Sequence, residues 1–110
     1  MSTRPWGSIK ESDYEDAEDF CGACLIDLNK PGEDKVKARC KLPVYEPKKM
    51  GRALNRNAVV AAAAALAGAR GGVKAPPEAK RKVARTLVRL YRRELKEDPP
   101  ESILRIAGMR

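Results

Sequence analysis

Three cysteines are the residues of this chain whose type and spacing are best suited to chemistry. Cys21 and Cys24 are separated by two residues, and Cys40 follows later in the chain. A structural zinc ion commonly takes four nitrogen or sulfur ligands, and the Cys-x-x-Cys spacing supplies two of them. Because the chain has no histidine, the fourth ligand would have to be Asp27 or a group from a partner. We favour the alternative, in which the cysteines are small buried apolar residues, so no metal or cofactor is predicted.

A disulfide is not expected either. An odd number of cysteines argues against the disulfide framework of a secreted domain. The N-terminus lacks the apolar segment of a signal peptide, and no membrane-spanning stretch is visible in the sequence. These features predict a cytoplasmic protein with reduced cysteines and without a membrane partner.

The remaining side chains do not form a catalytic set. Without histidine, the usual general bases and Ser-His-Asp arrangements are excluded. The serines lie in the N-terminal segment or at expected helix starts, with no base suggested nearby: Ser2, Ser8, Ser12 and Ser102. Carboxylates cluster at residues 11–19, where they are typical of a solvated helix surface. The sequence therefore predicts that the protein is not an enzyme.

Positive charge is concentrated in the second half of the chain. The formal net charge is +8 at pH 7. Residues 1–29 hold two basic and seven acidic side chains, whereas residues 51–110 hold fourteen basic and five acidic ones. Such an asymmetry predicts a polyanionic partner, or an acidic segment that packs against the basic half or against another copy of the chain. An ordinary charged, soluble surface would give the same composition.

Many of these basic residues fall on one side of a predicted helix over residues 78–96. Pro76 and Pro77 suit the first turn of this helix, and Glu78 follows them. At 100° per residue, one half of the helix is apolar and the opposite side is cationic. The apolar half contains Ala79, Val83, Ala84, Leu87, Val88, Leu90, Tyr91 and Leu95. The cationic side contains Arg81, Lys82, Arg85, Arg89, Arg92, Arg93 and Lys96, and it predicts a surface that binds phosphates or an acidic protein.

Four more cations lie on a predicted strand over residues 35–42. In this segment Lys35, Lys37, Arg39 and Lys41 alternate with Val36, Ala38, Cys40 and Leu42. Alternation with a period of two is typical of a half-buried strand, with the four cations on one face. The apolar run at residues 25–28 would be its antiparallel partner across the turn at residues 29–34. The four cations could extend the binding surface predicted for the helix.

Residues 55–72 predict a helix with almost no charge. Residues 61–65 are an unbroken run of alanine, which has the highest helix propensity. Asn55 or Asn57 can cap its start, and the glycines at Gly71–Gly72 can end it. A helix without charge on any face is normally buried. We therefore expect a central helix that neighbouring elements approach closely.

Together these elements predict a mainly helical α+β fold. Residues 1–11 are expected to form a loose N-terminal arm, and residues 12–107 a single compact domain. A capping box at Ser12 and Glu15 would open a short acidic helix. A last short helix would follow the prolines at Pro99–Pro100. Since an isolated hairpin is marginally stable, we expect the two strands to pack on the alanine-rich helix and the basic helix.

An ordered set of motifs extends over roughly residues 12–105. They are CLIDLN, KARCKLPVYEP, LNRNAVVAAAAALAGARGGV, and a basic helix that ends in LYRREL before DPPESI. The most specific pieces are Lys41-Leu42-Pro43, Gly68-Ala69-Arg70-Gly71-Gly72 and Pro99-Pro100. This arrangement resembles a segment of tailed phages and prophages that occurs in head-morphogenesis modules, near or fused to prohead proteases and capsid proteins. The resemblance implies a context, but it implies no activity and no catalytic residues.

The resemblance and the lack of a catalytic set predict a non-enzymatic structural or head-assembly protein of a phage or prophage. It would act through protein–protein contacts with capsid or other head-module proteins, and a homo-oligomer is compatible with this role. Its expected location is the virion or the host cytoplasm. The alternative is a nucleic-acid-binding protein that uses the basic face of the 78–96 helix, although no aromatic residue among the cations offers a platform for base stacking.

Overall fold

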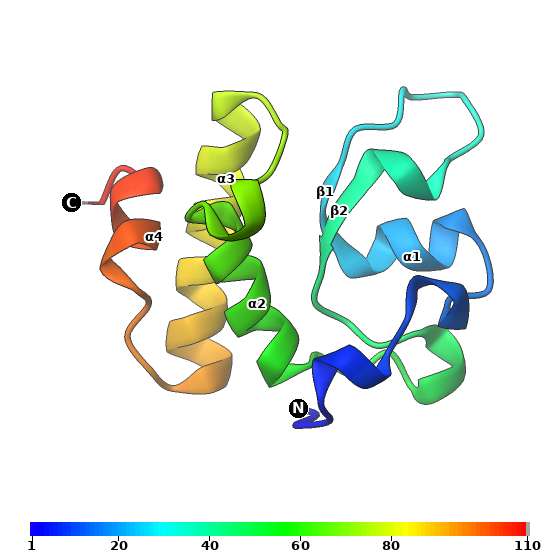
Figure 1. Cartoon of the computed structure of the whole chain (residues 1–110), viewed down its shortest axis with the longest axis horizontal. Helices are drawn as coiled ribbons and strands as arrows, with labels where there is room; N and C mark the ends of the chain where they lie inside the picture. The colour runs from blue at the N-terminus through cyan, green and yellow to red at the C-terminus, as the bar shows by residue number, and fades with distance from the viewer. Residues whose placement is uncertain (110) are drawn as a thin grey trace. The chain divides into compact units, whose positions relative to one another are not determined.

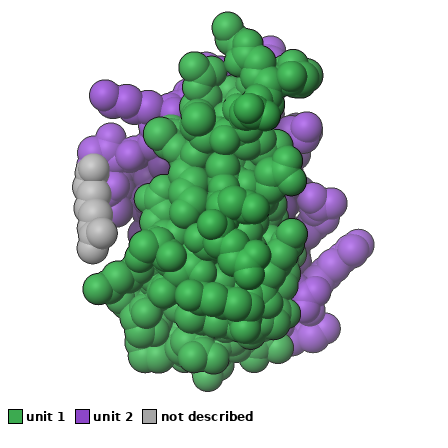
Figure 2. Space-filling view, turned by 90° about the vertical axis from the view of Figure 1, so that its right-hand side faces the viewer, with its two compact units in different colours: residues 1–58 green, residues 59–110 purple. Residues whose placement is uncertain are grey.

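The computed structural model describes residues 1–109, except for the side chain of Arg70 (Figure 1). The chain divides into two units, residues 1–58 and residue 59 onward, which are coloured separately in Figure 2. Helices of all kinds make up 53% of the chain, and a two-stranded antiparallel hairpin accompanies four α-helices in the described residues. The predicted mainly helical α+β class is therefore confirmed. No helix within residues 1–109 is long and apolar enough to cross a membrane.

The first α-helix, α1, spans Ala17–Ala23 and begins later than the sequence predicts. Its cap is Asp16, whose Oδ1 accepts a hydrogen bond from the backbone N–H of Asp19 over 2.8 Å. The predicted cap Ser12 lies instead in a short 3₁₀ turn, Glu11–Asp13. Asp13 closes this turn by accepting a hydrogen bond from the backbone N–H of Lys10. An aspartate therefore satisfies a backbone N–H at the start of α1 and at the start of the 3₁₀ turn, because its short side chain reaches nearby backbone N–H groups.

The hairpin pairs β1 (Cys24–Asp27) with β2 (Cys40–Pro43). Its register places Ile26 opposite Lys41 and Asp27 opposite Cys40. The run of apolar residues after α1 thus forms a strand as predicted, and the antiparallel pairing is confirmed.

The predicted strand over residues 35–42 is wrong for most of its length. Lys37–Arg39 form a 3₁₀ turn, and β2 begins only at Cys40. The side chain of Asn29 explains the difference, because it forms hydrogen bonds with both the N–H and the carbonyl of Val36. The Asn29 Oδ1 accepts from the Val36 N–H over 2.9 Å, and the Asn29 Nδ2 donates to the Val36 carbonyl over 3.3 Å. With both backbone groups of Val36 bonded to a side chain, the alternating segment does not continue the ladder.

The alanine-rich helix, α2, spans Arg56–Leu66 and is capped by Asn55, as predicted. It ends earlier than predicted, because Gly68 already has the left-handed backbone conformation that stops a helix (φ 116°). Burial is also less complete than its composition suggests. Ala58, Val59, Ala62, Ala63 and Leu66 are buried, whereas Val60, Ala61 and Ala64 are exposed. One side of α2 therefore faces solvent, although the helix carries no charge after its first turn.

The long basic helix is present, but its last part is a π-helix and not an α-helix. The α3 helix spans Pro77–Arg89, with a proline in its first turn, and continues as a π-helical segment, Leu90–Leu95. It ends at Lys96, which has a left-handed backbone (φ 59°). A last helix, α4 (Glu101–Ile106), packs against α3. The predicted apolar half is largely confirmed: Val83, Ala84, Leu87, Val88, Tyr91 and Leu95 are buried, and Ala79 and Leu90 are partly buried.

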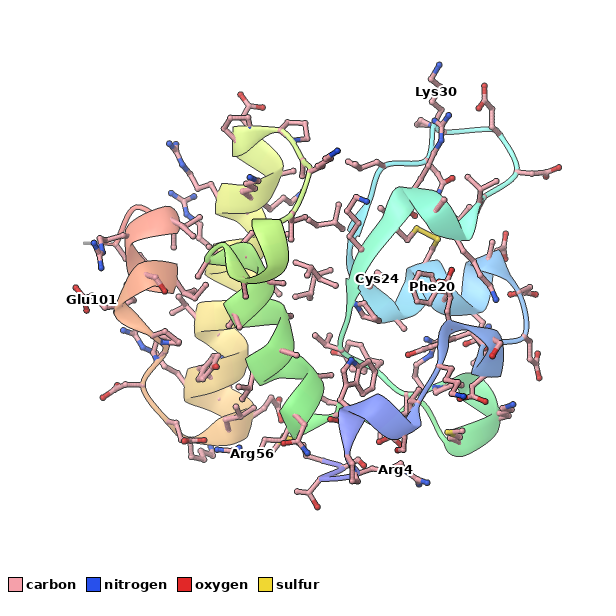
Figure 3. All side chains as sticks on the ribbon, in the orientation of Figure 1. Arg4, Phe20, Cys24, Lys30, Arg56 and Glu101 are labelled. Carbon is pink, nitrogen blue, oxygen red and sulfur yellow. A yellow bond between two sulfur atoms is a disulfide. The ribbon has the colours of Figure 1, made fainter. Side chains whose placement is uncertain are left out.

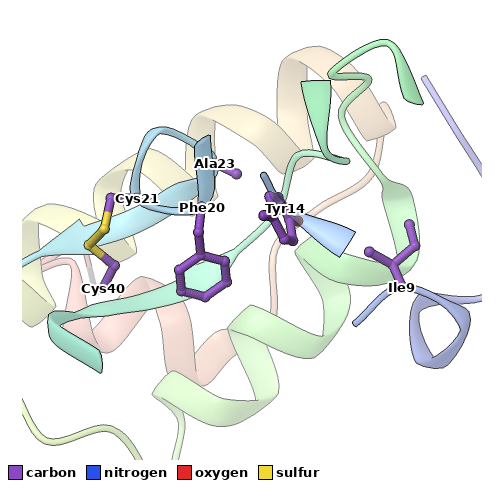
Figure 4. Packing of buried hydrophobic residues seen from close by; sticks show 6 residues of the cluster. All are labelled: Ile9, Tyr14, Phe20, Cys21, Ala23 and Cys40. Atoms are coloured by element: carbon purple, nitrogen blue, oxygen red, sulfur yellow. A yellow bond between two sulfur atoms is a disulfide. The ribbon is translucent and has the colours of Figure 1, made fainter. Parts of the chain in front are cut away.

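The buried cluster of the first unit joins α1 to the N-terminal segment and to β2 (Figure 4). Its members are Ile9, Tyr14, Phe20, Cys21, Ala23 and Cys40. The rings of Tyr14 and Phe20 meet edge to face with centroids 5.1 Å apart. The hydroxyl of Tyr14 donates to the carbonyl of Tyr45 over 2.6 Å, so the buried phenol has a partner.

The N-terminal residues, for which the sequence predicts a loose arm, are hydrogen-bonded to the segment before α2. The backbone N–H of Ser2 donates to the carbonyl of Leu54, and the carbonyl of Ser2 accepts from the backbone N–H of Arg56. The side-chain amide of Asn55 donates to the carbonyl of Arg4 over 3.0 Å. These bonds connect the two ends of the first unit.

Candidate functional site

Cys21 and Cys40 form a disulfide, which is the yellow bond in Figure 3. The expectation of three free cysteines is therefore wrong for this pair. Cys21 lies in the last turn of α1 and Cys40 begins β2, and their Cα atoms are 5.3 Å apart. The residues are 19 positions apart in sequence, so only the fold of the hairpin onto α1 reveals that the two sulfur atoms meet.

Cys24 is the free cysteine of the chain, and it lies outside this pair. Its side chain is partly buried and packs against the apolar cluster of the first unit. Burial raises the pKa of the Cys24 thiol to about 12, and the negative charges of Asp27 and Glu11 act in the same direction. The opposing effect of Arg52 is smaller. Cys24 is thus a neutral thiol near pH 7, and the predicted ligand set Cys21, Cys24 and Cys40 is not brought together as three thiolates.

The sulfur atoms of the disulfide lie beside Asp27 instead. Cys21 and Cys40 each offer a sulfur atom and Asp27 a carboxylate oxygen as a possible metal ligand, and these three atoms lie within 4.8 Å of one another. The Asn29 Nδ2 is close to all of them: 3.6 Å from the Cys21 Sγ, 3.2 Å from the Cys40 Sγ and 2.8 Å from the Asp27 Oδ1. We refer to Cys21, Asp27, Asn29 and Cys40 as the sulfur–carboxylate cluster. Asp27 is a possible fourth ligand from the sequence, whereas the sequence pattern does not indicate Asn29. The only signal for Asn29 is its place in the turn after β1.

Asp27 is also paired with Lys35, whose Nζ lies 2.6 Å from the Asp27 Oδ2. The hydrogen bond from Lys35 is the main cause that lowers the pKa of Asp27, and hydrogen bonds from Asn29 add to it against the opposing effect of burial. The same pair raises the pKa of Lys35. Asp27 is therefore ionised near pH 7, and a carboxylate stands next to the disulfide.

The predicted cationic side of the basic helix is fully displayed in the second unit. All seven residues are exposed: Arg81, Lys82, Arg85, Arg89, Arg92, Arg93 and Lys96. Two of them bond to neutral groups, Arg85 to the carbonyl of Ala107 (3.1 Å) and Arg89 to the hydroxyl of Thr86 (3.2 Å). Among the side chains that the structure describes, none of the seven is ion-paired with a carboxylate. We call this set the cationic face.

The four cations predicted to share a strand face do not do so. Lys35 is paired with Asp27, and the Lys37 Nζ donates to the carbonyls of Glu11 and Tyr14 at 3.2 and 3.3 Å. Lys41 alone lies on the strand, while Lys37 and Arg39 are in the 3₁₀ turn before it. These four residues belong to the first unit, whereas the cationic face belongs to the second.

The acidic segment at residues 11–19 finds cations within its own unit. Asp19 is 1% exposed and its Oδ1 lies 2.7 Å from the Arg52 Nη2. A second guanidinium nitrogen of Arg52 donates to the Asp19 carbonyl over 2.8 Å. Asp13 and Lys49 form a longer, more exposed pair at 3.8 Å. Part of the negative charge of residues 11–19 is thus balanced inside the first unit.

Comparison of the chain with protein-family models, with curated proteins and with solved structures finds no match.

Proposed function

We propose that this chain is a non-enzymatic head-assembly protein of a tailed phage or prophage, which binds an acidic surface of another head-module protein through the cationic face. The observation that carries the proposal is the display of seven exposed cations without a carboxylate partner among the described side chains. The phage context rests on the ordered motifs of the sequence, and the lack of histidine supports a role other than catalysis.

Charge and geometry favour a partner that is itself negative. Like charges gathered on one helix repel each other, and an acidic partner relieves this repulsion while steering association. Five of the seven residues are arginines, whose planar guanidinium groups match carboxylates in pairs of hydrogen bonds. The opposite side of α3 is buried, so the cationic side is the one available to a partner.

A pull-down against the proteins encoded in the same head module tests the proposal, with duplex DNA added as a competitor. We expect the wild-type chain to capture a capsid or other head protein in the presence of DNA. The double variant Arg81→Glu/Arg92→Glu should bind at least about tenfold more weakly, because it places negative charge on the cationic face. Neither side chain is used in a hydrogen bond or ion pair among the described residues.

A matched control carries the same change in net charge on the first unit. Lys30 and Lys48 are both exposed, and Lys30→Glu/Lys48→Glu should leave capture within about twofold of wild type. Equal loss in both double variants would show that net charge alone matters. Capture that survives charge reversal of the cationic face would contradict the proposal.

Nucleic acid is the second candidate partner, because guanidinium and ammonium groups bind phosphates as well as carboxylates. If duplex DNA is the partner, the logarithm of its affinity should fall with the logarithm of salt concentration by about 0.9 per phosphate neutralised. DNA should then abolish capture of head proteins in the pull-down. A titration without measurable DNA binding at low salt would exclude this candidate.

A further inference from the structure

We propose that Cys21, Cys40 and Asp27 form a redox-controlled zinc site, which is closed to metal while the disulfide is intact and binds Zn²⁺ after a dithiol has reduced it. The proposal concerns the first unit alone and does not depend on the cationic face. It replaces the Cys-x-x-Cys ligand pair suggested by the sequence with a pair that the fold brings together.

The position of the Asn29 side chain is the first argument. Its Nδ2 atom is surrounded by two sulfur atoms, the carboxylate oxygen of Asp27 and the carbonyl oxygen of Val36, at 2.8–3.6 Å. An amide NH₂ group has only two N–H bonds to donate. Four electron-rich atoms therefore surround a single donor nitrogen, although Asp27 also accepts from Lys35 and Val36 also accepts from the backbone N–H of Arg39. A cation bound at this point would take the place of the Asn29 amide.

The ligand chemistry is the second argument. Two thiolates and a carboxylate are ligands that Zn²⁺ accepts, at about 2.3 Å for sulfur and about 2.0–2.2 Å for oxygen. In the structure the three donor atoms already lie within 4.8 Å of one another. Breaking the disulfide lets the two sulfur atoms move apart around a shared ion, and water completes the tetrahedral set.

The reductive step balances as a thiol–disulfide exchange. One thiolate of the dithiol attacks a sulfur of the disulfide and forms a mixed disulfide, and the second thiolate then displaces the protein sulfur. The reductant leaves as its own disulfide, and two electrons and two protons have passed to Cys21 and Cys40. Zn²⁺ then replaces the two thiol protons, which are released to solvent.

Lys35 is the competitor of the metal in this arrangement. It holds the Asp27 Oδ2 at 2.6 Å and shares the carboxylate with Asn29. A bound Zn²⁺ would have to displace or share this ammonium group, and two cations beside one carboxylate repel each other. Removing the charge at Lys35 should therefore strengthen zinc binding. Cys24 is not among the three ligand atoms that lie close together, so it is not part of the proposed site.

The test is a titration with Co²⁺, followed by competition with Zn²⁺, on the full chain reduced anaerobically with a phosphine. A phosphine is used because a dithiol would itself bind the metal. Reduced wild-type protein should show a thiolate-to-cobalt charge-transfer band that saturates at one ion per chain, and Zn²⁺ should abolish it. The oxidised protein should show no such band.

Variants assign the ligands. Asp27→Asn should weaken Co²⁺ binding at least about tenfold, and Cys40→Ser should abolish the charge-transfer band. Lys35→Met should bind Co²⁺ at least about twofold more tightly. Cys24→Ser is the matched control, and its affinity should stay within about twofold of wild type.

Circular dichroism of each reduced variant shows whether it is folded. If reduction alone unfolds the first unit, addition of Zn²⁺ should restore the helical signal, because metal binding then supplies folding free energy. The proposal is overturned if reduced wild type shows neither the charge-transfer band nor a zinc-dependent recovery of structure. It is equally overturned if Cys24→Ser, while folded, loses the band.

Discussion

The carboxylate of Glu46 accepts a hydrogen bond from the side-chain amide of Asn55 over 2.9 Å, with both side chains buried. The amide oxygen of Asn55 in turn accepts from the backbone N–H of Ala58 over 2.9 Å. Arg4 lies 3.6 Å from the other carboxylate oxygen. A buried negative charge thus orients the residue that caps α2, and the start of this helix depends on a contact nine residues away in sequence.

Asn55→Ala should lower the free energy of unfolding by about 2–4 kcal/mol. Loss of a helix cap costs about 1 kcal/mol, and Glu46 would also lose a buried hydrogen-bond partner, which costs about 1–3 kcal/mol. Chemical denaturation measures the change. Asn57→Ala is the control, because the side chain of Asn57 bonds to Thr3 and Arg4 at an exposed position. An equal loss of unfolding free energy in the two variants would show that the cap at Asn55 stabilises the protein no more than the exposed hydrogen bonds of Asn57.

Acid should destabilise the protein through Glu46. Burial alone would raise the pKa of Glu46, but hydrogen bonds from Ser2 and Asn55 and the charge of Arg4 outweigh it, so the pKa is lower than usual. The folded carboxyl then binds protons less readily than the unfolded one. This contribution to stability is complete above the ordinary glutamate pKa of about 4.3 and is lost as pH falls through the lower folded-state value.

Denaturation at about pH 7 and at about pH 3 checks this expectation. Glu46→Gln should be less stable than wild type near neutral pH, and the difference between the two proteins should shrink in acid. An unchanged difference across this range would assign the acid sensitivity to other carboxylates.

Local patterns in the sequence predicted the elements that depend on neighbouring residues. The apolar half of α3 follows from its period of 3.6 residues, and the asparagine cap of α2 follows from residue type alone. The interactions around Asn29 could not be predicted in this way. Its hydrogen bonds to Val36 replace strand pairing in a segment whose alternation is otherwise typical of a strand. The disulfide was missed because it depends on how the hairpin folds onto α1.

Ala63→Leu should destabilise the protein more than Arg89→Ala. Ala63 is 2% exposed in the middle of the alanine run, and additional bulk in a filled site costs about 1–3 kcal/mol. Arg89 is exposed and bonds only to the neighbouring hydroxyl of Thr86 among described groups, so its removal should cost at most about 0.5 kcal/mol. Thermal melts of the two variants give the comparison. A melting temperature of Ala63→Leu at or above wild type would show that this side of α2 tolerates bulk.

Arg89→Ala should weaken partner binding even though its melting temperature stays near that of wild type. This follows from the proposed role of the cationic face, and the pull-down with head-module proteins measures it. A variant that binds as well as wild type would argue that Arg89 lies outside the contact.

Reduction of the disulfide should lower the free energy of unfolding by about 3 kcal/mol in the absence of metal. The two cysteines are 19 residues apart, and the loss of chain entropy in the unfolded state by closing a loop of this length gives about that value. Denaturation of oxidised and reduced protein, in buffer with a metal chelator, measures the difference. Identical curves would show that the covalent link does not restrain the unfolded chain.

The Cys21–Cys40 link also determines how the protein would respond to mechanical load. A force applied to the two ends of the chain passes through the sulfur–sulfur bond and bypasses the backbone between these residues. That segment would carry no force while the rest of the chain is stretched. None of the residues inside the closed ring would then add the usual extended length of about 3.3–3.6 Å. The fully stretched oxidised chain would therefore be shorter than the reduced chain by about the contour length of the ring, a difference that single-molecule stretching can resolve.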